Sequence, residues 1–187
     1  MANSDTGKIR IIGGSARSRH IKFHALDHLR PTPDRVRETL FNWLGSHLNG
    51  ATCLDLFAGS GALGFEALSR GAGQVYLVES NRKIASDLKI NLDLLSFQNA
   101  SVENCRAESF LKTTQHKFHI VFMDPPYSSD LLQPTINLSE QLNILEPGAL
   151  VYLEQRKNAE SPTLPETWHC HRQQECGEVL ARLYHIH

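Results

Sequence analysis

Short apolar runs alternate with amphipathic stretches along most of the chain. Apolar runs of strand length occupy residues 51–56, 74–78, 100–105, 118–123 and 149–154. Between them, residues 62–70, 82–95, 108–114 and 131–142 have the spacing of helices. Two last runs, 168–175 and 179–186, read as strands joined through Gly177. Alternating strands and helices predict an α/β fold, doubly wound, with a parallel sheet covered by helices on both faces.

The N-terminal part has a different pattern. Residues 10–23 read as two short strands around a Gly/Ser turn. Thr32 suits a helix N-cap and Pro33 the first helical position. An apolar stripe then continues to Leu48. A chain of 187 residues predicts one domain, with a basic hairpin at 1–29, a helix at 30–48 and a catalytic sheet at 51–187.

Composition excludes several classes of protein. No stretch is long and apolar enough to span a membrane, and no apolar signal segment is present at the N-terminus. Four cysteines form no Cys-x-x-Cys pair, and Cys53 and Cys105 fall in predicted strands, so we expect buried free thiols. The ten histidines form no zinc signature. We therefore expect a cytoplasmic protein without a bound metal.

Positive charge is concentrated at the N-terminal end. Residues 1–40 hold eight Lys/Arg against four Asp/Glu, whereas the whole chain has a net charge of -1. A localised basic surface suggests phosphate contacts with a nucleic acid. A solvated basic arm without a partner is the alternative. The candidate RNA-binding residues are Arg10, Arg17, Arg19, Lys22, Arg35 and Arg37.

A glycine turn follows the strand predicted at 51–56. Gly59, Gly61 and Gly64 have the spacing of a dinucleotide-binding fingerprint, and Glu79 lies 20 residues beyond Gly59, where a carboxylate can accept ribose hydroxyls. A NAD-dependent oxidoreductase therefore stays possible. Asp55 argues against it, because an anion beside a pyrophosphate is unfavourable. The same anion suits S-adenosylmethionine, which carries an ammonium and a sulfonium and no phosphate.

A second motif follows the strand predicted at 118–123. Asp124, Pro125, Pro126 and Tyr127 combine a carboxylate, two rigid residues and an aromatic ring. The loop offers only acceptors for a planar amine, and the ring of Tyr127 can stack on a base. In the doubly wound order the first and fourth strands are neighbours, so this motif and the glycine turn should face one crevice.

Four segments in order carry a resemblance to a known family. They are Arg10-Ile-Ile-Gly-Gly, the run from Arg30-Pro-Thr to Trp43-Leu, the run from Asp55 to Gly64, and Asp124-Pro-Pro-Tyr. Over nearly its whole length the chain resembles the bacterial 16S ribosomal RNA guanine-N2 methyltransferases of the RsmD type. Asp-Pro-Pro-Tyr alone is shared by many amino-methyltransferases.

The resemblance implies a Rossmann-like seven-strand methyltransferase sheet, S-adenosylmethionine, and a guanine in the head of the small ribosomal subunit. In such families the loop holds the methionine part, the carboxylate at the next strand end holds the ribose, and a later segment holds the adenine. The corresponding residues here are Asp55, Ala58, Gly59, Ser60 and Gly61 for methionine, Glu79 for ribose and Ala107 for adenine.

We therefore expect a monomeric methyltransferase acting on 16S rRNA within a small-subunit particle. The guanine is flipped against Tyr127, and Asp124 with the Pro125 carbonyl accepts hydrogen bonds from its amine. An amino-methyltransferase acting on adenine N6 or cytosine N4, in DNA or RNA, would use the same pocket. A non-enzymatic ribosome-assembly factor with a vestigial pocket is a further alternative.

Overall fold

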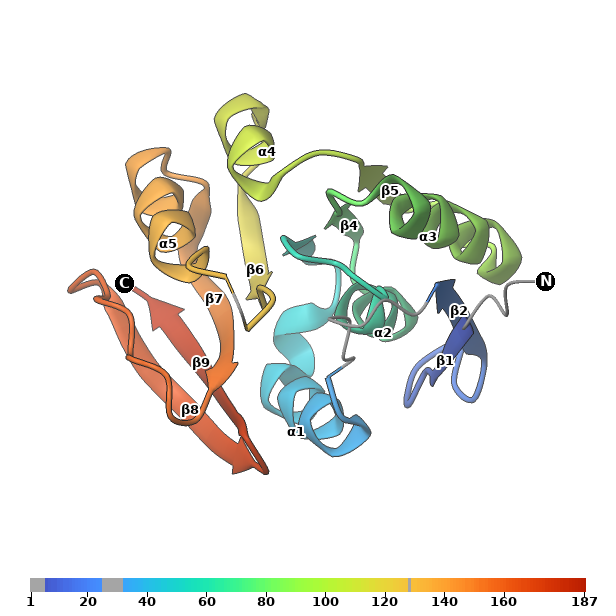
Figure 1. Ribbon diagram of the computed structural model, residues 1–187, viewed down its shortest axis with the longest axis horizontal. Coiled ribbons are helices and arrows are strands. Elements are labelled where there is room, and N and C mark those ends of the chain that lie inside the picture. Colours follow the sequence, from blue (N-terminus) through green and yellow to red (C-terminus); the bar gives the residue numbers. More distant parts are fainter. Residues whose placement is uncertain (1–5, 25–31, 128) are drawn as a thin grey trace.

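A seven-stranded sheet forms the centre of the molecule (Figure 1). The computed structural model describes residues 6–24, 32–127 and 129–187. The strand order is β5-β4-β3-β6-β7-β9-β8, and β9 runs antiparallel to both of its neighbours. The strands are β3 (Thr52–Asp55), β4 (Gln74–Val78), β5 (Ala100–Glu103), β6 (Phe118–Met123), β7 (Leu145–Arg156), β8 (Trp168–Cys176) and β9 (Val179–Ile186). This confirms the predicted doubly wound α/β sheet.

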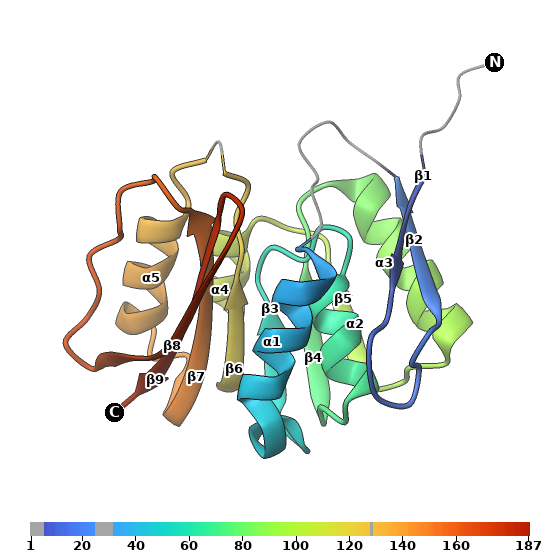
Figure 2. The same ribbon diagram turned by 90° about the horizontal axis from the view of Figure 1, so that it is seen from below.

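Helices cover both faces of the sheet (Figures 1 and 2). One face packs against α1 (Asp34–Leu44), α2 (Ala62–Ser69) and α3 (Arg82–Leu95), and the other against α4 (Ala107–Thr113) and α5 (Leu132–Gln141). Each face has its own apolar core, because alternate residues of a strand point to opposite sides. Phe122 thus belongs to the first core and Val121 to the second. Among the described residues, no helix combines the length and apolarity needed to cross a membrane.

Two of the predicted strand limits are wrong. β5 ends at Glu103, so Cys105 lies beyond the strand and is only half-buried. β7 begins at Leu145 instead of 149 and runs through Pro147 and Gly148. A register shift between β6 and β7 accommodates these two residues, and proline within a sheet is confined to such irregularities and to edges.

The N-terminal hairpin consists of β1 (Thr6–Arg10) and β2 (His20–His24). It lies beside α3 (Figure 2), where the His24 amide donates to Asp87 and the Lys22 amide to Asn91. Its loop is held to α2 by Glu66, which accepts the amides of Ile12 and Gly13 at 2.8 Å each. A hairpin is confirmed, but its first strand begins at Thr6, before the predicted range of residues 10–23. Residues 1–5 and 25–29 lie outside the described part of the chain.

The start of α1 differs from the prediction. Pro33 occupies the N-cap position and the helix begins at Asp34, while Thr32 makes no cap. The Thr32 hydroxyl instead donates to Asp124 Oδ2 at 3.2 Å. Gly45, with a φ of 47°, ends the helix, and a 3₁₀ turn spans Gly45–Leu48. Residues 30 and 31 of the predicted helix lie outside the described residues.

Candidate active site

A cavity of about 950 Å³ opens at the carboxyl ends of β3, β4 and β6. This is the edge where doubly wound sheets bind ligands, and the volume is typical of a small-molecule site. The sequence-predicted catalytic and cofactor residues line it, with the exception of Gly61. They are Asp124, Pro125, Pro126, Tyr127, Asp55, Ala58, Gly59, Ser60, Glu79 and Ala107.

Asp55 ends β3 and is almost completely buried at the base of the cavity, with 2% of its surface exposed. Its Oδ2 atom accepts the Gly64 amide at 2.9 Å. Burial raises the pKa of Asp55 to about 7, and the negative charge of Glu79 adds to the effect, while the Gly64 amide opposes it. A buried carboxylate with one neutral donor is a strong site for a cationic group.

The glycine turn brings the backbone close to this carboxylate. A Cβ atom on Gly64 would lie 2.2 Å from Leu77 Cδ2 and 3.2 Å from Asp55 Oδ2, so only glycine allows α2 to approach β4 this closely. Gly61 adopts a φ of 81°, which lets the chain turn into the helix. A pyrophosphate would normally take the amides at this helix start. Here Asp55 has taken the Gly64 amide, which disfavours NAD.

Glu79 follows β4 and is fixed by backbone amides. Its two carboxylate oxygens accept the Gly59 amide at 3.0 Å and the Asn81 amide at 2.6 Å. The side chain is half-buried and lines the cavity beside Ala107, the first residue of α4. Glu108 also lines the cavity. A carboxylate held in this way has acceptor capacity left for ribose hydroxyls.

Asp124 follows β6 directly, on the strand next to β3, so its carboxylate shares the cavity with Asp55. Burial, and then the charges of Glu154 and Asp55, hold the pKa of Asp124 well above its usual range, while the hydrogen bond from Thr32 opposes this. The group is therefore both a hydrogen-bond acceptor and a base of raised proton affinity. Such carboxylates are typical of catalytic sites.

Tyr127 is held at both its hydroxyl and its ring. The hydroxyl donates to Glu154 Oε1 at 2.7 Å, and the guanidinium carbon of Arg156 lies 5.7 Å from the ring centroid. Burial and the charge of Glu154 raise the pKa of the Tyr127 hydroxyl, so it stays protonated and donates. The sequence suggested a role for the ring alone, whereas the structure also gives the hydroxyl a partner.

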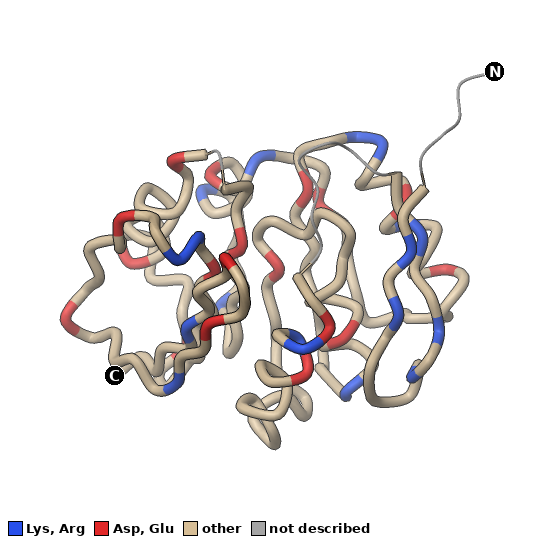
Figure 3. The backbone as a smooth tube through the Cα atoms, turned by 60° about the horizontal axis from the view of Figure 1, so that its bottom comes forward, with Lys and Arg blue, Asp and Glu red and all other residues tan. Residues whose placement is uncertain are grey.

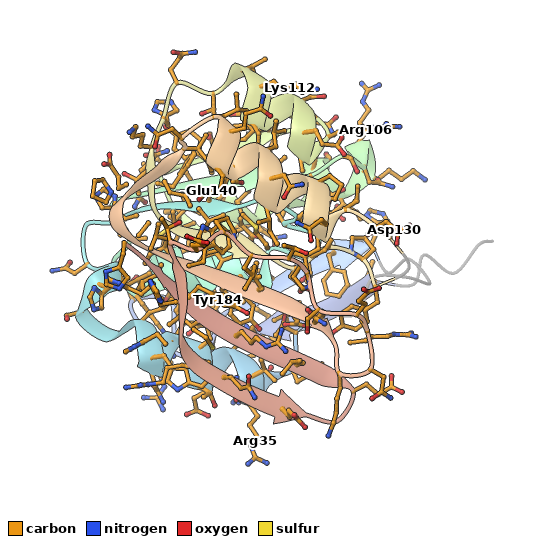
Figure 4. All side chains as sticks on the ribbon, turned by 90° about the vertical axis from the view of Figure 1, so that its left-hand side faces the viewer. Arg35, Arg106, Lys112, Asp130, Glu140 and Tyr184 are labelled. Carbon is orange, nitrogen blue, oxygen red and sulfur yellow. The ribbon has the colours of Figure 1, made fainter. Side chains whose placement is uncertain are left out.

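The candidate RNA-binding residues lie away from the cavity. Figure 3 shows positive charges distributed along the hairpin, where Arg17, Arg19 and Lys22 are exposed. Arg19 donates to the Leu94 carbonyl at 3.1 Å, which ties one end of the loop to α3. Arg35 is exposed on α1 and points away from the body of the protein (Figure 4). These residues form a surface and not a pocket.

The prediction for Arg37 is wrong. Its side chain is 1% exposed, and its Nη2 atom contacts Asp34 Oδ1 at 2.5 Å and the Arg10 carbonyl at 3.0 Å. Its Nη1 atom lies 3.8 Å from Glu66 Oε2. Arg37 thus binds the hairpin and α2 internally and offers no charge to a phosphate. Arg10 is exposed but lies 3.8 Å from Asp34, so its charge is partly countered.

Sequence reasoning missed four residues around the Asp-Pro-Pro-Tyr loop, namely Thr32, Tyr152, Glu154 and Arg156. One signal could have identified Glu154. It follows the apolar run Leu150–Leu153 at the end of a predicted strand that neighbours the strand before Asp124. A charge placed there is expected near the same crevice. Among the described residues, no group of three or more His, Cys, Asp or Glu has the arrangement of a metal site.

The sheet order, the glycine turn and the cavity define a Rossmann-like methyltransferase fold. A family described as "Conserved hypothetical protein 95" matches residues 9–185, and the chain belongs to that family.

Relatives and solved structures agree with this assignment. The chain is 48% identical over 182 residues to "Ribosomal RNA small subunit methyltransferase D" of Escherichia coli strain K12, covering 97% of this chain and 92% of that protein. The protein of the same name from Haemophilus influenzae is 44% identical, with 95% and 94% covered. A solved structure from Escherichia coli superposes with a TM-score of 0.87 at 48% identity, covering 96% of this chain and 98% of the other.

Proposed function

We propose that this protein is an S-adenosylmethionine-dependent methyltransferase that modifies the exocyclic N2 of a guanine in 16S ribosomal RNA. One observation carries the proposal. Two buried or half-buried carboxylates, Asp55 and Asp124, end neighbouring parallel strands and line the same cavity. One suits a cationic cofactor, and the other suits a target amine. The names of the relatives support ribosomal RNA of the small subunit as the substrate.

The chain's own residues fit the cofactor. Asp55 provides the negative charge for an ammonium, Glu79 provides acceptors for the ribose, and the apolar wall beside Ala107 can take an adenine. Ala58, Gly59 and Ser60 leave room for the methionine part of the molecule. When bound, S-adenosylmethionine supplies a methyl group on a positively charged sulfur, which leaves as a neutral thioether.

The guanine amine needs help because its lone pair is delocalised into the ring. Asp124 and the Pro125 carbonyl accept its hydrogen bonds, which orients the lone pair and stabilises the positive charge that develops on N2. Pro126 keeps the loop extended, and Tyr127 stacks on the flipped base. Asp124 then takes the proton that N2 releases.

The RNA would lie across the hairpin and α1, where Arg17, Arg19, Lys22 and Arg35 are exposed. These residues do not recognise the RNA sequence, because contacts to phosphates position a nucleic acid but carry no information about its bases. A complete small-subunit particle supplies that specificity through its shape. The enzyme acts on it as a monomer in the cytoplasm. An adenine or cytosine amine in DNA is the competing substrate for the same loop.

Three measurements test the proposal. Isothermal titration calorimetry should show saturable binding of S-adenosylhomocysteine and none of NAD. Incubation of unmethylated 30S particles, naked 16S rRNA and duplex DNA with labelled S-adenosylmethionine, followed by mass spectrometry of nucleosides, should give N2-methylguanosine in the 30S sample, much less in naked rRNA and none in DNA. The Asp124→Ala variant should lower turnover by about 10²-fold while changing S-adenosylhomocysteine affinity far less.

Methylated adenine or cytosine in the DNA sample would assign the enzyme to the competing class. Binding of NAD without a response to S-adenosylhomocysteine would reject the methyltransferase. An Asp124→Ala variant with turnover within a few-fold of the wild type would make Asp124 a turn residue only. Binding of S-adenosylhomocysteine with no methylation of any substrate would instead favour a non-enzymatic assembly factor.

A further inference from the structure

Glu154 is a buried acid that the proposed reaction does not yet use. It lies near the end of β7, and 3% of its surface is exposed. Both carboxylate oxygens are occupied, one by the Tyr127 hydroxyl and the other by the Tyr152 hydroxyl, each at 2.7 Å. Glu154 is buried and is not among the residues that line the cavity, so it acts on a substrate only through its neighbours.

This arrangement is costly for the folded protein. Among the described residues, no Lys, Arg or His forms an ion pair with Glu154, and a buried carboxylate without a cation is unfavourable. Burial accordingly raises the pKa of Glu154, although hydrogen bonds from Tyr127, Tyr152 and Thr32 lower it in part. A glutamine or an apolar side chain would cost less, which points to a functional reason for the acid.

The charged and titratable groups around Glu154 all belong to the cavity wall or its support. They are Asp124 and Tyr127 from the loop after β6, and Tyr152 and Arg156 from β7, while Asp55 from β3 acts on Asp124. Burial raises the pKa of both tyrosines, and the charge of Glu154 adds to it, so both hydroxyls remain donors. The acid thus receives two hydrogen bonds from tyrosines. Asp124 and Glu154 directly follow Met123 and Leu153, which are register partners in β6 and β7, so the negative charge of Glu154 lies beside Asp124.

We infer that Glu154 is a positioning residue for methyl transfer, which fixes the ring of Tyr127 and, through its charge, makes Asp124 a better base. The inference rests on the proposed function. In that reaction the N2 lone pair forms the bond to the methyl carbon, and the carbon–sulfur bond breaks with its electron pair on sulfur. N2 then holds a positive charge and loses one proton to Asp124. A negative charge beside Asp124 favours this proton uptake.

The decisive variant is Glu154→Gln, which removes the charge and keeps the size. Activity should rise with pH as Asp124 ionises. Without the neighbouring charge, the pKa of Asp124 falls, so the acidic limb of the kcat profile should move to lower pH. The kcat on the plateau should fall about 10- to 100-fold, because the base is weaker and the ring less fixed. Single-turnover rates on the rRNA substrate across pH give both values.

Tyr127→Phe is the matched comparison, because it removes the hydrogen bond to Glu154 but keeps the Glu154 charge. We expect a lower kcat/KM with an unmoved acidic limb. Melting temperature and S-adenosylhomocysteine affinity establish that each variant is folded. Glu154→Asp, which keeps the charge, should retain the acidic limb of the wild type, and it serves in place of Glu154→Gln if that variant does not fold.

An unchanged kcat and an unmoved limb in Glu154→Gln would overturn the inference. So would a limb that moves equally in Tyr127→Phe, because the charge would then not be the cause. The inference would also be overturned if the acidic limb of the kcat profile of Glu154→Asp differed from that of the wild type. These results are distinct from a failure of the proposed function, in which the wild-type enzyme itself methylates no rRNA.

Discussion

The Asp55 carboxylate occupies a poor environment for a negative charge until a cation arrives. Among the described residues its hydrogen-bond donor is the Gly64 amide, and burial raises its pKa to about 7. Binding energy from an ammonium at this position is therefore large, because the cation relieves an existing electrostatic cost.

We expect Asp55→Ala to weaken S-adenosylhomocysteine binding about 10- to 100-fold, the range of a hydrogen bond to a charged group. Calorimetry of the purified variant measures this. Asp93→Ala, which removes an exposed acid of α3, is the control for net charge and should bind like the wild type. Equal affinities of the Asp55 variant and the wild type would show that the ammonium lies elsewhere.

The sequence predicted the residues of the site that end strands, such as Asp55, Glu79 and Asp124. Each follows an apolar run directly, so its place at the carboxyl edge of the sheet follows from local pattern and topology. Arg37 could not be predicted in the same way. Its position off the apolar stripe of α1 suggested exposure, but Asp34, Glu66 and the Arg10 carbonyl come together around it only in the folded chain.

At the scale of elements, the hairpin is joined to the rest of the fold by apolar side chains such as Ile11, Ile21 and Phe23 and by a few buried polar contacts. Glu66 of α2 is fully buried, and its carboxylate accepts two hairpin amides. The same carboxylate lies 2.6 Å from the Arg70 Nε atom and 3.8 Å from the Arg37 Nη1 atom. Ser69 adds a hydrogen bond to the Ala16 amide at 2.9 Å. The helix that follows the glycine turn therefore also fixes the proposed RNA surface.

Removing Glu66 should destabilise the protein strongly. Glu66→Ala leaves the Arg37 guanidinium buried with less compensation, a change worth about 3–5 kcal/mol for a broken buried pair. Urea unfolding measures the loss, and hydrogen exchange should show faster exchange at the Ile12 and Gly13 amides. Glu38→Ala, on the exposed face of α1, should leave both unchanged. A loss below about 1 kcal/mol in Glu66→Ala would mean that Asp34 alone compensates Arg37.

The hairpin should contribute RNA affinity without contributing cofactor affinity. Arg17→Ala with Arg19→Ala removes two exposed charges, and each lost phosphate contact should reduce the salt slope of RNA binding by about 0.7–0.9. Filter binding at several salt concentrations measures the slope. Lys112→Ala with Lys117→Ala removes the same charge near the opposite sheet face and is the matched control. An unaltered slope in the arginine variant would make the hairpin a solvated arm.

Sequence pattern accounted for the elements well and for their contacts poorly. Periodicity predicts the hairpin and the helices. Local pattern also predicts that Thr32 caps a helix, whereas its hydroxyl donates to Asp124, 92 positions along the chain. The sequence predicts that the fifth strand of the sheet starts only at residue 149, because Pro147 and Gly148 are residues that usually interrupt strands. In both cases a neighbour distant in sequence overrides the local preference.

At the scale of the whole molecule, the acids of the cavity make stability depend on pH. Asp55 and Asp124 line the cavity and Glu154 lies behind it on β7, and burial is the main cause that raises the pKa of all three acids. The unfolded chain ionises these groups near pH 4, whereas the folded chain resists ionisation. Their contribution to stability is therefore complete below about pH 4 and is lost as pH rises through the folded pKa.

For Asp55 the window extends from about pH 4 to about pH 7, the folded pKa value. The free energy of unfolding of the wild type, minus that of Asp55→Asn, should fall by roughly 2 kcal/mol between pH 5 and pH 7, because the asparagine does not titrate. Urea unfolding at several pH values measures this difference. Saturating S-adenosylhomocysteine should reduce the fall, since its ammonium favours the ionised acid. If the difference in unfolding free energy between the two proteins did not change with pH, Asp55 would already be ionised in the folded protein without a ligand. The surroundings of Asp55 would then be more polar than its burial indicates.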